Sequence, residues 1–377
     1  MILNNLKASK RKSSVISVGY YCFLDESTNL GVANKVKQFT DMMASMGYVA
    51  VLNIFAPGGY APHIRMMRAI FNDNFDIIIY RLYPQSPSAF IMAGIFLIMR
   101  ARGCKVIVDV PTPVSVVLRE LKFCNCSSYR KILSVILAYL NIPFTIWSAN
   151  RVIQYAPERG WFQFGLNRKT LLTANGVCAS SFPLRIRNQE WSGDTLRIIA
   201  VSSLTEWQGF DRLIWGISSY ERAHPTNKPC KIHLRIIGEG PVRAELQLLV
   251  GTLSLNHLVE FYGAKIGEDL NQHIQWADIA VGTLAAYRKG LHFASPLKHR
   301  EYTARGIPFI FGCADPDFDP PPKFTLQVAN DDSSINMDVV LRWVKHLASE
   351  KDLDIKIREY AINKLDFTVK LAHYLKV

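Results

Sequence analysis

The sequence predicts an α/β protein made of two doubly wound, Rossmann-like domains that face each other across a cleft. The chain has 377 residues, more than one ordinary core accommodates, and 49% of them are hydrophobic. Short β-branched runs alternate with longer amphipathic stretches, which is typical of parallel sheets covered by helices on both faces. A polar segment without periodicity, residues 178–195, interrupts this alternation, which then resumes.

The first half of the chain contains six apolar runs that are predicted strands: 13–20, 48–56, 76–82, 104–110, 151–156 and 169–175. A helix is predicted over 31–47. Two further apolar stretches, 89–99 and 132–147, are predicted as buried helices or as surfaces in a lipid interface. Both fall short of the roughly 20 residues that span a bilayer. Asn141 and Pro143 also interrupt the apolar sequence of the second stretch.

The second half repeats the pattern, with predicted strands at 196–204, 231–241, 258–264, 277–284 and 324–330. A helix is predicted over 210–222, and a final helical stretch runs from about 337 to 377. These elements suggest a first domain over 1–180, a linker over 181–195 and a second domain over 196–350. The C-terminal helix, 351–377, is free to pack back on the first domain.

Composition limits the compartment and the partners. Seven cysteines, an odd number without regular spacing, favour reduced thiols and a cytoplasmic location, and no secretory signal is expected. The net charge of +13 suits nucleic acid, phosphorylated small molecules or an anionic membrane surface. The basic cluster at residues 7–12 is interpreted either as a solvated tail or as a peripheral contact with the inner face of the cell membrane.

Several common α/β functions lack their motifs. The dinucleotide fingerprint Gly-x-Gly-x-x-Gly does not follow the first predicted strand, and the two glycines of "IIGEGP" (236–241) indicate only a tight turn. No phosphate-binding Walker lysine motif occurs. Asp315 and Asp317 form an Asp-x-Asp pattern in a Pro-rich segment, which we interpret as a loop. No metal and no other cofactor is therefore expected.

One basic cluster is a candidate anion site. Arg288, Lys289, Lys298 and Arg300 lie within 13 residues, next to a helix predicted to begin near Pro296. Fixed cations and helix N-terminal amides stabilise a nucleoside diphosphate as it leaves. Lys298 and Arg288 are the candidates for phosphate contact, whereas Lys289 and Arg300 are interpreted as surface or supporting residues.

The order of motifs in the second domain resembles the C-terminal half of GT-B glycosyltransferases, and more narrowly the family 4-like enzymes of bacterial surface-polysaccharide assembly, such as O-antigen and capsule synthesis. The motifs are "IIAVSSLTEWQGFDRLI", "IIGEGP", "VEFYGA", "ADIAVGTL" and "SPLKHREYTARGIPFI". The first domain agrees more loosely, through "NLGVANKVKQFTDMMASMGY" and "ANGV".

This resemblance implies a donor nucleotide-sugar on the second domain. Glu301 occupies the position of the family's ribose-binding glutamate. The sequence also departs from the family, because the partner glutamate falls on Phe293. The two usual phosphate cations, an arginine and a lysine, fall on Ser203 and Gln208.

The predicted donor-binding residues are Glu301, Lys298, Arg288, Gly209, Ser295 and Leu297. Gly209 would let backbone approach a phosphate, and Ser295 and Leu297 lie at the predicted helix start. The predicted catalytic residues are Lys298, Arg288 and Asp109. Asp109 ends a predicted strand at the cleft edge, where it could contact acceptor or sugar or serve only the turn.

The resemblance implies a hexosyltransferase-type enzyme (EC 2.4), retaining and metal-independent, that glycosylates a saccharide or lipid-linked oligosaccharide. Two alternatives stay open at this point. A GT-B-fold sugar-nucleotide epimerase would use the same nucleotide site without an acceptor. A polyanion- or nucleic-acid-binding protein would explain the charge, although such proteins present a basic, aromatic face rather than one charged loop and helix.

Overall fold

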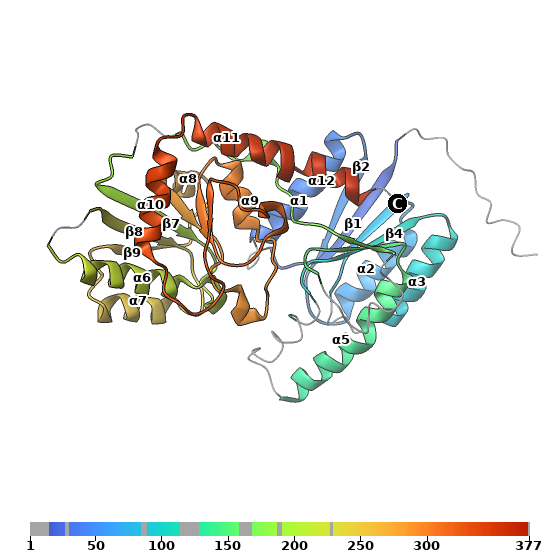
Figure 1. The fold of residues 1–377 in the computed structure, drawn as a ribbon. Coiled ribbons are helices and arrows are strands. Elements are labelled where there is room, and N and C mark those ends of the chain that lie inside the picture. Colours follow the sequence, from blue (N-terminus) through green and yellow to red (C-terminus); the bar gives the residue numbers. More distant parts are fainter. Residues whose placement is uncertain are drawn as a thin grey trace, which may run out of the picture.

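The computed structural model describes residues 15–26, 30–83, 89–113, 116, 128–157, 168–186, 191–226 and 229–375. The basic cluster at 7–12 lies outside these ranges. Within them the chain forms two α/β domains, each built on one six-stranded sheet in which every pairing is parallel (Figure 1). The predicted fold class is confirmed.

The first sheet has the order β2-β1-β3-β4-β5-β6. Its strands are β1 (Ser17–Phe23), β2 (Val49–Phe55), β3 (Ile77–Arg81), β4 (Lys105–Val110), β5 (Arg151–Gln154) and β6 (Thr170–Leu172). Helix α1 (Leu30–Ser45) packs on one face. The opposite face carries α2 (Ala61–Asn72), α3 (Ala89–Ala101) and α5 (Ser128–Ser148).

The second sheet has the order β12-β11-β10-β7-β8-β9. Its strands are β7 (Thr195–Val201), β8 (Lys231–Ile237), β9 (Val259–Gly263), β10 (Ile279–Val281), β11 (Phe309–Phe311) and β12 (Thr325–Gln327). One face is covered by α6 (Phe210–Ala223), α7 (Arg243–Thr252) and α10 (Met337–Ala348). The other is covered by α8 (Gly267–Trp276), α9 (Leu297–Ala304) and α11 (Leu353–Tyr360).

Two elements differ from their predicted extent. Strand β1 ends at Phe23 rather than at residue 20, because Tyr21, Cys22 and Phe23 continue the buried pairing with β2. Helix α5 begins at Ser128, before the predicted start at residue 132, and runs through Pro143. Proline removes only one donor and kinks rather than ends a helix that is held by packing. None of the helices in the described ranges has the length and apolarity to cross a bilayer.

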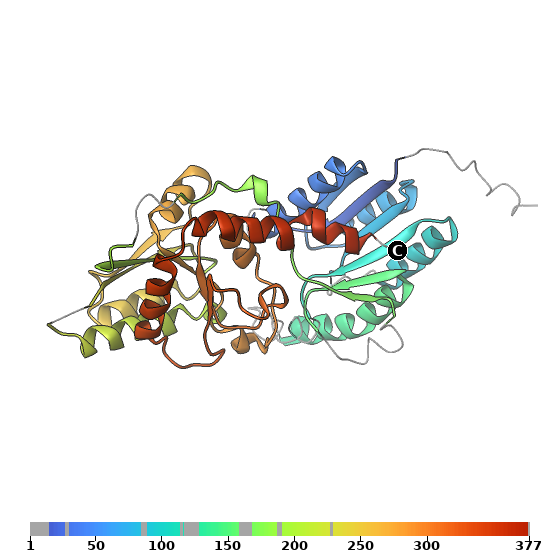
Figure 2. The same cartoon turned by 45° about the horizontal axis from the view of Figure 1, so that its top comes forward.

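The end of the chain returns to the first domain. After α11 a π-helical turn (Ala361–Leu365) leads into α12 (Phe367–Tyr374). The Phe367 ring lies 5.6 Å from that of Phe39 on α1, and the Tyr374 hydroxyl donates to the Tyr155 hydroxyl at 3.2 Å. Figure 2 shows this last segment, in red, passing in front of both domains. The C-terminal helix therefore completes the first domain's core.

Candidate active site

Two cavities lie between the domains, where the carboxyl ends of both parallel sheets meet. Their volumes are about 620 and 580 Å³, and they share Gly31 of the first domain with Ser202, Ser203 and Leu297 of the second. Clefts at the carboxyl ends of doubly wound sheets are the usual ligand sites of such folds. We refer to them as the first and the second cavity.

The start of α9 separates the two cavities. The Asn175 amide N–H, from the first domain, donates to Ser295 Oγ at 2.7 Å, and the Asn175 side chain donates to the Ser295 carbonyl. Pro296 precedes the helix in an extended conformation, and Pro296, Leu297 and Lys298 line the first cavity. The N-terminus of α9 therefore lies at the cleft. Ser295 therefore fixes the helix start against the first domain, and it lines the first cavity together with Leu297.

Lys298 extends from the first turn of α9 into the first cavity. Its Nζ donates to Gln208 Oε1 at 2.7 Å, and Thr283 Oγ1 donates to the same oxygen at 3.4 Å. Burial lowers the pKa of Lys298 to about 7, although Glu301 nearby favours the charged form. An ammonium with few solvent contacts is poised to gain from an anion, because a bound negative charge would offset its lost hydration.

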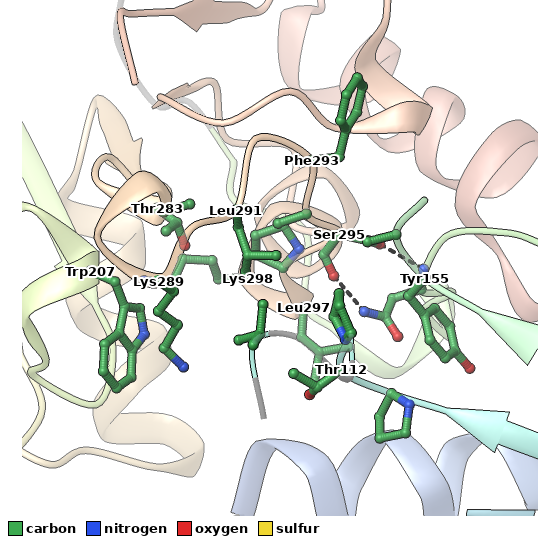
Figure 3. A pocket seen from close by; sticks show the side chains of 18 of the residues that line it. Thr112, Tyr155, Trp207, Thr283, Lys289, Leu291, Phe293, Ser295, Leu297 and Lys298 are labelled. Atoms are coloured by element: carbon green, nitrogen blue, oxygen red, sulfur yellow. Dashed lines mark hydrogen bonds between the residues drawn. The ribbon is translucent and has the colours of Figure 1, made fainter. Parts of the chain in front are cut away.

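Figure 3 shows how the first cavity is walled. Trp207 and Lys289 stand on one side, Thr112 and Tyr155 on the other, and Lys298 lies between them. Lys289 Nζ lies 3.5 Å from the centre of the Trp207 ring. The cavity therefore combines two cations with an aromatic platform, a surface suited to sugar rings and to anionic groups.

Glu301 lies one turn further along α9 and lines the second cavity. Its carboxylate accepts from Arg305 Nε at 3.0 Å, and the Glu301 side chain remains 30% exposed. The Asn271 side-chain oxygen accepts from Arg305 Nη1 at 2.7 Å. Because Arg305 is 5% exposed while Glu301 is open, the pair leaves carboxylate oxygen available toward the cavity. Four cationic side chains share the lining: Lys35, Lys265, Arg300 and Arg305.

Gly209 is a glycine for a packing reason. It has a φ of 69°, and a Cβ there would lie 2.8 Å from the Cβ of Ala285 and 3.0 Å from that of Leu284. It is not among the described residues that line either cavity. The glycine thus lets the loop that carries Gln208 approach the loop after β10, and direct contact between its backbone and a phosphate stays a prediction.

Arg288 is bound to carboxylates instead of facing a cavity. Its two terminal nitrogens donate to the Asp211 carboxylate at 2.9 and 2.8 Å, and one of them also reaches Asp332 at 2.8 Å. It also donates to the Glu206 carbonyl at 2.8 Å. The structure therefore places Arg288 as a brace behind the Gln208 loop, and its predicted catalytic contact would require it to leave these partners.

Asp109 lies deeper than a cleft residue. It is 2% exposed and is not among the described residues that line the two cavities. Its Oδ2 accepts from the Tyr20 hydroxyl at 2.6 Å and from Arg81 at 3.2 Å. Burial, reinforced by Asp109, raises the pKa of Tyr20 well above its usual value, so Tyr20 stays a donor. This arrangement favours a structural role for Asp109, the second alternative that the sequence left open, over contact with substrate.

The sequence did not reveal the anchor of α9. Arg300, interpreted as a surface or supporting residue, is 1% exposed and pairs with Asp315 and with Asp317 Oδ2 at 2.6 Å. Its Nε donates to the Asn175 carbonyl at 3.0 Å. His299 Nδ1 lies 2.9 Å from Asp315 Oδ2. The Asp-x-Asp pattern was the available signal, since two carboxylates so close to a basic helix require partners.

Comparison with known proteins agrees with this architecture. Residues 195–317 match the family model described as "Glycosyl transferases group 1", which covers most of the second domain. No curated protein matches the chain. The match to that model covers strands β7 to β11, the Gln208 loop, α9 and Asp315. It therefore includes the second-domain side of the cleft and the anchor of α9.

Solved structures match almost the whole chain. A glycosyltransferase from Rickettsia africae ESF-5 has a TM-score of 0.62 at 12% identity, covering 97% of this chain and 98% of that one. The lipopolysaccharide outer core galactosyltransferase WaaB has a TM-score of 0.58 at 12% identity, covering 96% and 100%. The catalytic domain of starch synthase IV from Arabidopsis thaliana has a TM-score of 0.60 at 11% identity, covering 96% and 98%.

These matches favour neither the epimerase nor the polyanion-binding alternative. At these identities the solved structures establish the two-domain fold, and the family model adds the activity class of the second domain. The chain is a glycosyltransferase of the GT-B fold.

Proposed function

We propose that this enzyme transfers a sugar from a nucleoside-diphosphate donor to a hydroxyl of a lipid-linked saccharide in bacterial surface-polysaccharide assembly. The bond between the anomeric carbon and the diphosphate breaks, and the acceptor oxygen bonds to that carbon with retention of configuration. The hydroxyl proton leaves with the diphosphate. The reaction takes place on the cytoplasmic side of the membrane.

The contact between Lys298 and Gln208 carries this proposal. In the resembled family a lysine occupies the position of Gln208, and here Lys298 Nζ lies 2.7 Å from the Gln208 side-chain oxygen. Lys298 on α9 thus brings a cation to the position where the resembled family has a lysine on the loop. There, together with the first-turn amides of α9, it neutralises charge that develops on the leaving diphosphate.

The second cavity suits the nucleoside. Glu301 presents an open carboxylate one helical turn from Lys298, which matches the spacing between a diphosphate and the ribose beyond it. A carboxylate accepts hydrogen bonds from two adjacent hydroxyls. Support for a nucleotide in this cleft also comes from the Arabidopsis starch synthase IV domain, whose structure contains ADP and acarbose.

The acceptor would lie in the first cavity, whose Trp207 ring and Lys289 ammonium offer stacking and charge to a saccharide that bears an anionic group. The likeness to a lipopolysaccharide outer core galactosyltransferase supports a surface glycan as product. No metal takes part in this proposal, because Asp315 and Asp317 are both occupied by Arg300 and the cleft supplies its own cations.

The test is acceptor-dependent release of a nucleoside diphosphate. The purified chain is incubated with UDP-, GDP- and dTDP-sugars, with and without a lipid-linked oligosaccharide fraction, and products are identified by mass spectrometry. We expect one donor to yield one diphosphate per sugar transferred, with the anomeric configuration kept. Interconversion of the donor sugar without any acceptor would contradict transfer and would favour an epimerase.

A further inference from the structure

The outer surface of α3 is apolar although solvent reaches it. From Phe90 to Met99 the helix contains no charged or polar side chain. Met92, Phe96 and Met99 fill the core beneath it. On its outer side Phe90 is 51% exposed and Ile91 61%. A helix that is apolar all round is normally covered on every side, so this face lacks its cover within the described chain.

Helix α5 continues the same surface. Tyr129, Ile132, Ile136 and Trp147 are between 49% and 75% exposed, and their spacing places them along one side of the helix. The Phe90 ring lies 4.6 Å from that of Phe144, so the apolar faces of α3 and α5 join. Single exposed apolar side chains are common on soluble proteins, but a patch this long marks an interaction surface.

The helices beneath this patch carry positive charge only, although two carboxylates, Asp73 and Asp76, follow α2 in the turn before β3. Helices α2, α3 and α5, which together cover this face of the first sheet, contain no aspartate or glutamate in their sequences. Arg65 and Arg68 are exposed on α2, and Arg102 and Lys105 are exposed just beyond α3. The Arg102 guanidinium lies 4.3 Å from the centre of the Phe71 ring. Basic residues around an exposed apolar surface attract an anionic bilayer.

We propose that the outer face of α2, α3 and α5 docks on the surface of an anionic phospholipid bilayer. Apolar side chains would enter the boundary between headgroups and acyl chains, while the arginines meet lipid phosphates. Tyr129, Tyr139 and Trp147 provide the aromatic rings that favour that boundary. This surface would be the membrane contact of the proposed enzyme. The docking itself does not depend on the proposed function, which supplies only the lipid-linked acceptor.

The docking face leads to the cleft. The carboxyl end of β4 lies at the cleft, where Pro111, Thr112 and Pro113 line the first cavity. Because α5 runs antiparallel to the strands that it joins, its Ser128 end lies on the cleft side (Figure 1). A bilayer seated on α3 and α5 would therefore place the headgroup of a lipid-linked saccharide near the mouth of the first cavity.

The experiment compares two full-length variants of equal charge. In the face variant, glutamate replaces four exposed isoleucines: Ile91, Ile98, Ile132 and Ile136. In the control variant, glutamate replaces four exposed residues of the second domain and C-terminal segment: Leu248, Val339, Ile355 and Ile362. Both variants lower the net charge from +13 to +9 (13 − 4), so a difference between them reports position and not overall charge.

Binding is measured by co-sedimentation with vesicles of phosphatidylglycerol and phosphatidylcholine, and with phosphatidylcholine alone. We expect the wild type and the control variant to bind the anionic vesicles, and the face variant to bind at least about tenfold more weakly. Melting temperatures should agree because every changed side chain is exposed. Nucleoside diphosphate binding by the same samples tests the donor site separately, so failure of docking leaves the proposed reaction intact.

Three results would overturn docking through this face. The face variant could bind vesicles as well as the control variant, which would move the contact elsewhere on the chain. The wild type could fail to bind anionic vesicles at low salt. Finally, sedimentation equilibrium could show a wild-type dimer that the face variant loses, with no vesicle binding, in which case a second copy of the chain covers the patch.

Discussion

Lys298 reaches Gln208 from α9, so a single contact joins the helix that separates the two cavities to the loop that lines the first cavity. Ser203 and Gln208 leave the usual phosphate cations missing from that loop. A cation on a helix start is well placed to replace them, because it adds to the partial positive charge of the first-turn amides.

The lowered pKa of Lys298 predicts pH-dependent anion binding. Its pKa of about 7 in the free protein means that the ammonium loses its proton as pH rises above 7. A bound diphosphate favours the charged form, so the affinity for pyrophosphate should fall by up to about tenfold per pH unit above 7. The Lys298→Met variant should show a weaker dependence. What remains is expected from Lys35, whose pKa burial also lowers to about 7 and which lines the second cavity. Calorimetric titration between pH 7 and 9 measures both proteins. Pyrophosphate also titrates in this range, but that titration affects both proteins equally, so equal slopes would refute the role of Lys298.

Glu301 should distinguish a nucleoside from a bare phosphate. Because its carboxylate faces the second cavity, the Glu301→Ala variant should bind a nucleoside diphosphate more weakly by roughly 1.5–3 kcal/mol, yet bind pyrophosphate as the wild type does. Lys298→Ala should weaken both ligands. Arg305→Lys controls for the loss of the ion pair with Glu301. If the Glu301→Ala variant bound pyrophosphate more weakly than the wild type, Glu301 would not act through the nucleoside alone, which would contradict this assignment.

The sequence was informative for side chains on α9 and less so for residues whose partners come from distant segments. Lys298 and Glu301 follow from a helix start and a motif spacing, and both face the cavities. Arg288 looked available because its partner Asp211 lies 77 positions earlier in the chain. Asp109 ends a strand as predicted, but its pairing with Tyr20 crosses 89 positions. Pairs of residues this far apart in the sequence are recognised only in the folded structure.

At the scale of elements, α9 depends on the buried cluster of His299, Arg300 and Asp315. The pKa of Asp315 is lowered to about 2: burial alone would raise it, but Arg300 and His299 outweigh that effect. A carboxylate with a lowered pKa stabilises the fold above its ordinary pKa of 3.8, and that stability is lost as pH falls toward 2. The start of α9 is thus secured at neutral pH.

Removing that charge should destabilise the second domain. Asp315→Asn keeps the shape but leaves Arg300 buried without its full counter-charge, which should cost about 3–5 kcal/mol of unfolding free energy. Asp319→Asn, at an exposed position nearby, should cost under about 0.5 kcal/mol. Urea denaturation compares the two variants, and equal stabilities would show that the cluster does not hold α9.

The elements themselves were mostly within reach of the sequence, since continuous apolar strands between helices indicate parallel sheets. The errors arise where tertiary packing overrides local preference. Strand β1 extends to Phe23 because its neighbours bury it on both faces. Helix α5 begins four residues before the predicted apolar stretch and packs along α3 through Pro143. Neither effect is contained in a local window of residues.

At the scale of the molecule, the cleft provides cations from both domains, with Lys35 from the first and Lys298 and Lys289 from the second. These charges, with helix amides, are placed to do what a divalent cation does for a diphosphate elsewhere. Turnover should therefore stay within about twofold of its starting value in excess EDTA. A complete loss that manganese or magnesium restores would contradict metal independence.

The facing arrangement of the two domains was predicted, but the contacts that join them lay beyond sequence analysis. The C-terminal segment was free to pack on the first domain, but only the structure shows Phe367 against Phe39 and Asn175 clamped to Ser295. The chain thus crosses between the domains at residues 174–178 and again near 366. The two crossing segments lie side by side, because Val177 pairs with Asp366 and the Ala179 N–H donates to the Asp366 carboxylate. Motion that opens the cleft must pass through these two points.

Donor binding tests the central claim most directly. Titration calorimetry of UDP, GDP, dTDP and CMP is carried out with the wild type, Lys298→Ala and Glu301→Ala. We predict that one nucleotide binds the wild type and that each variant, while keeping its fold, weakens that nucleotide by at least about tenfold. A nucleotide that binds both folded variants with wild-type affinity would contradict the assignment of the donor to α9.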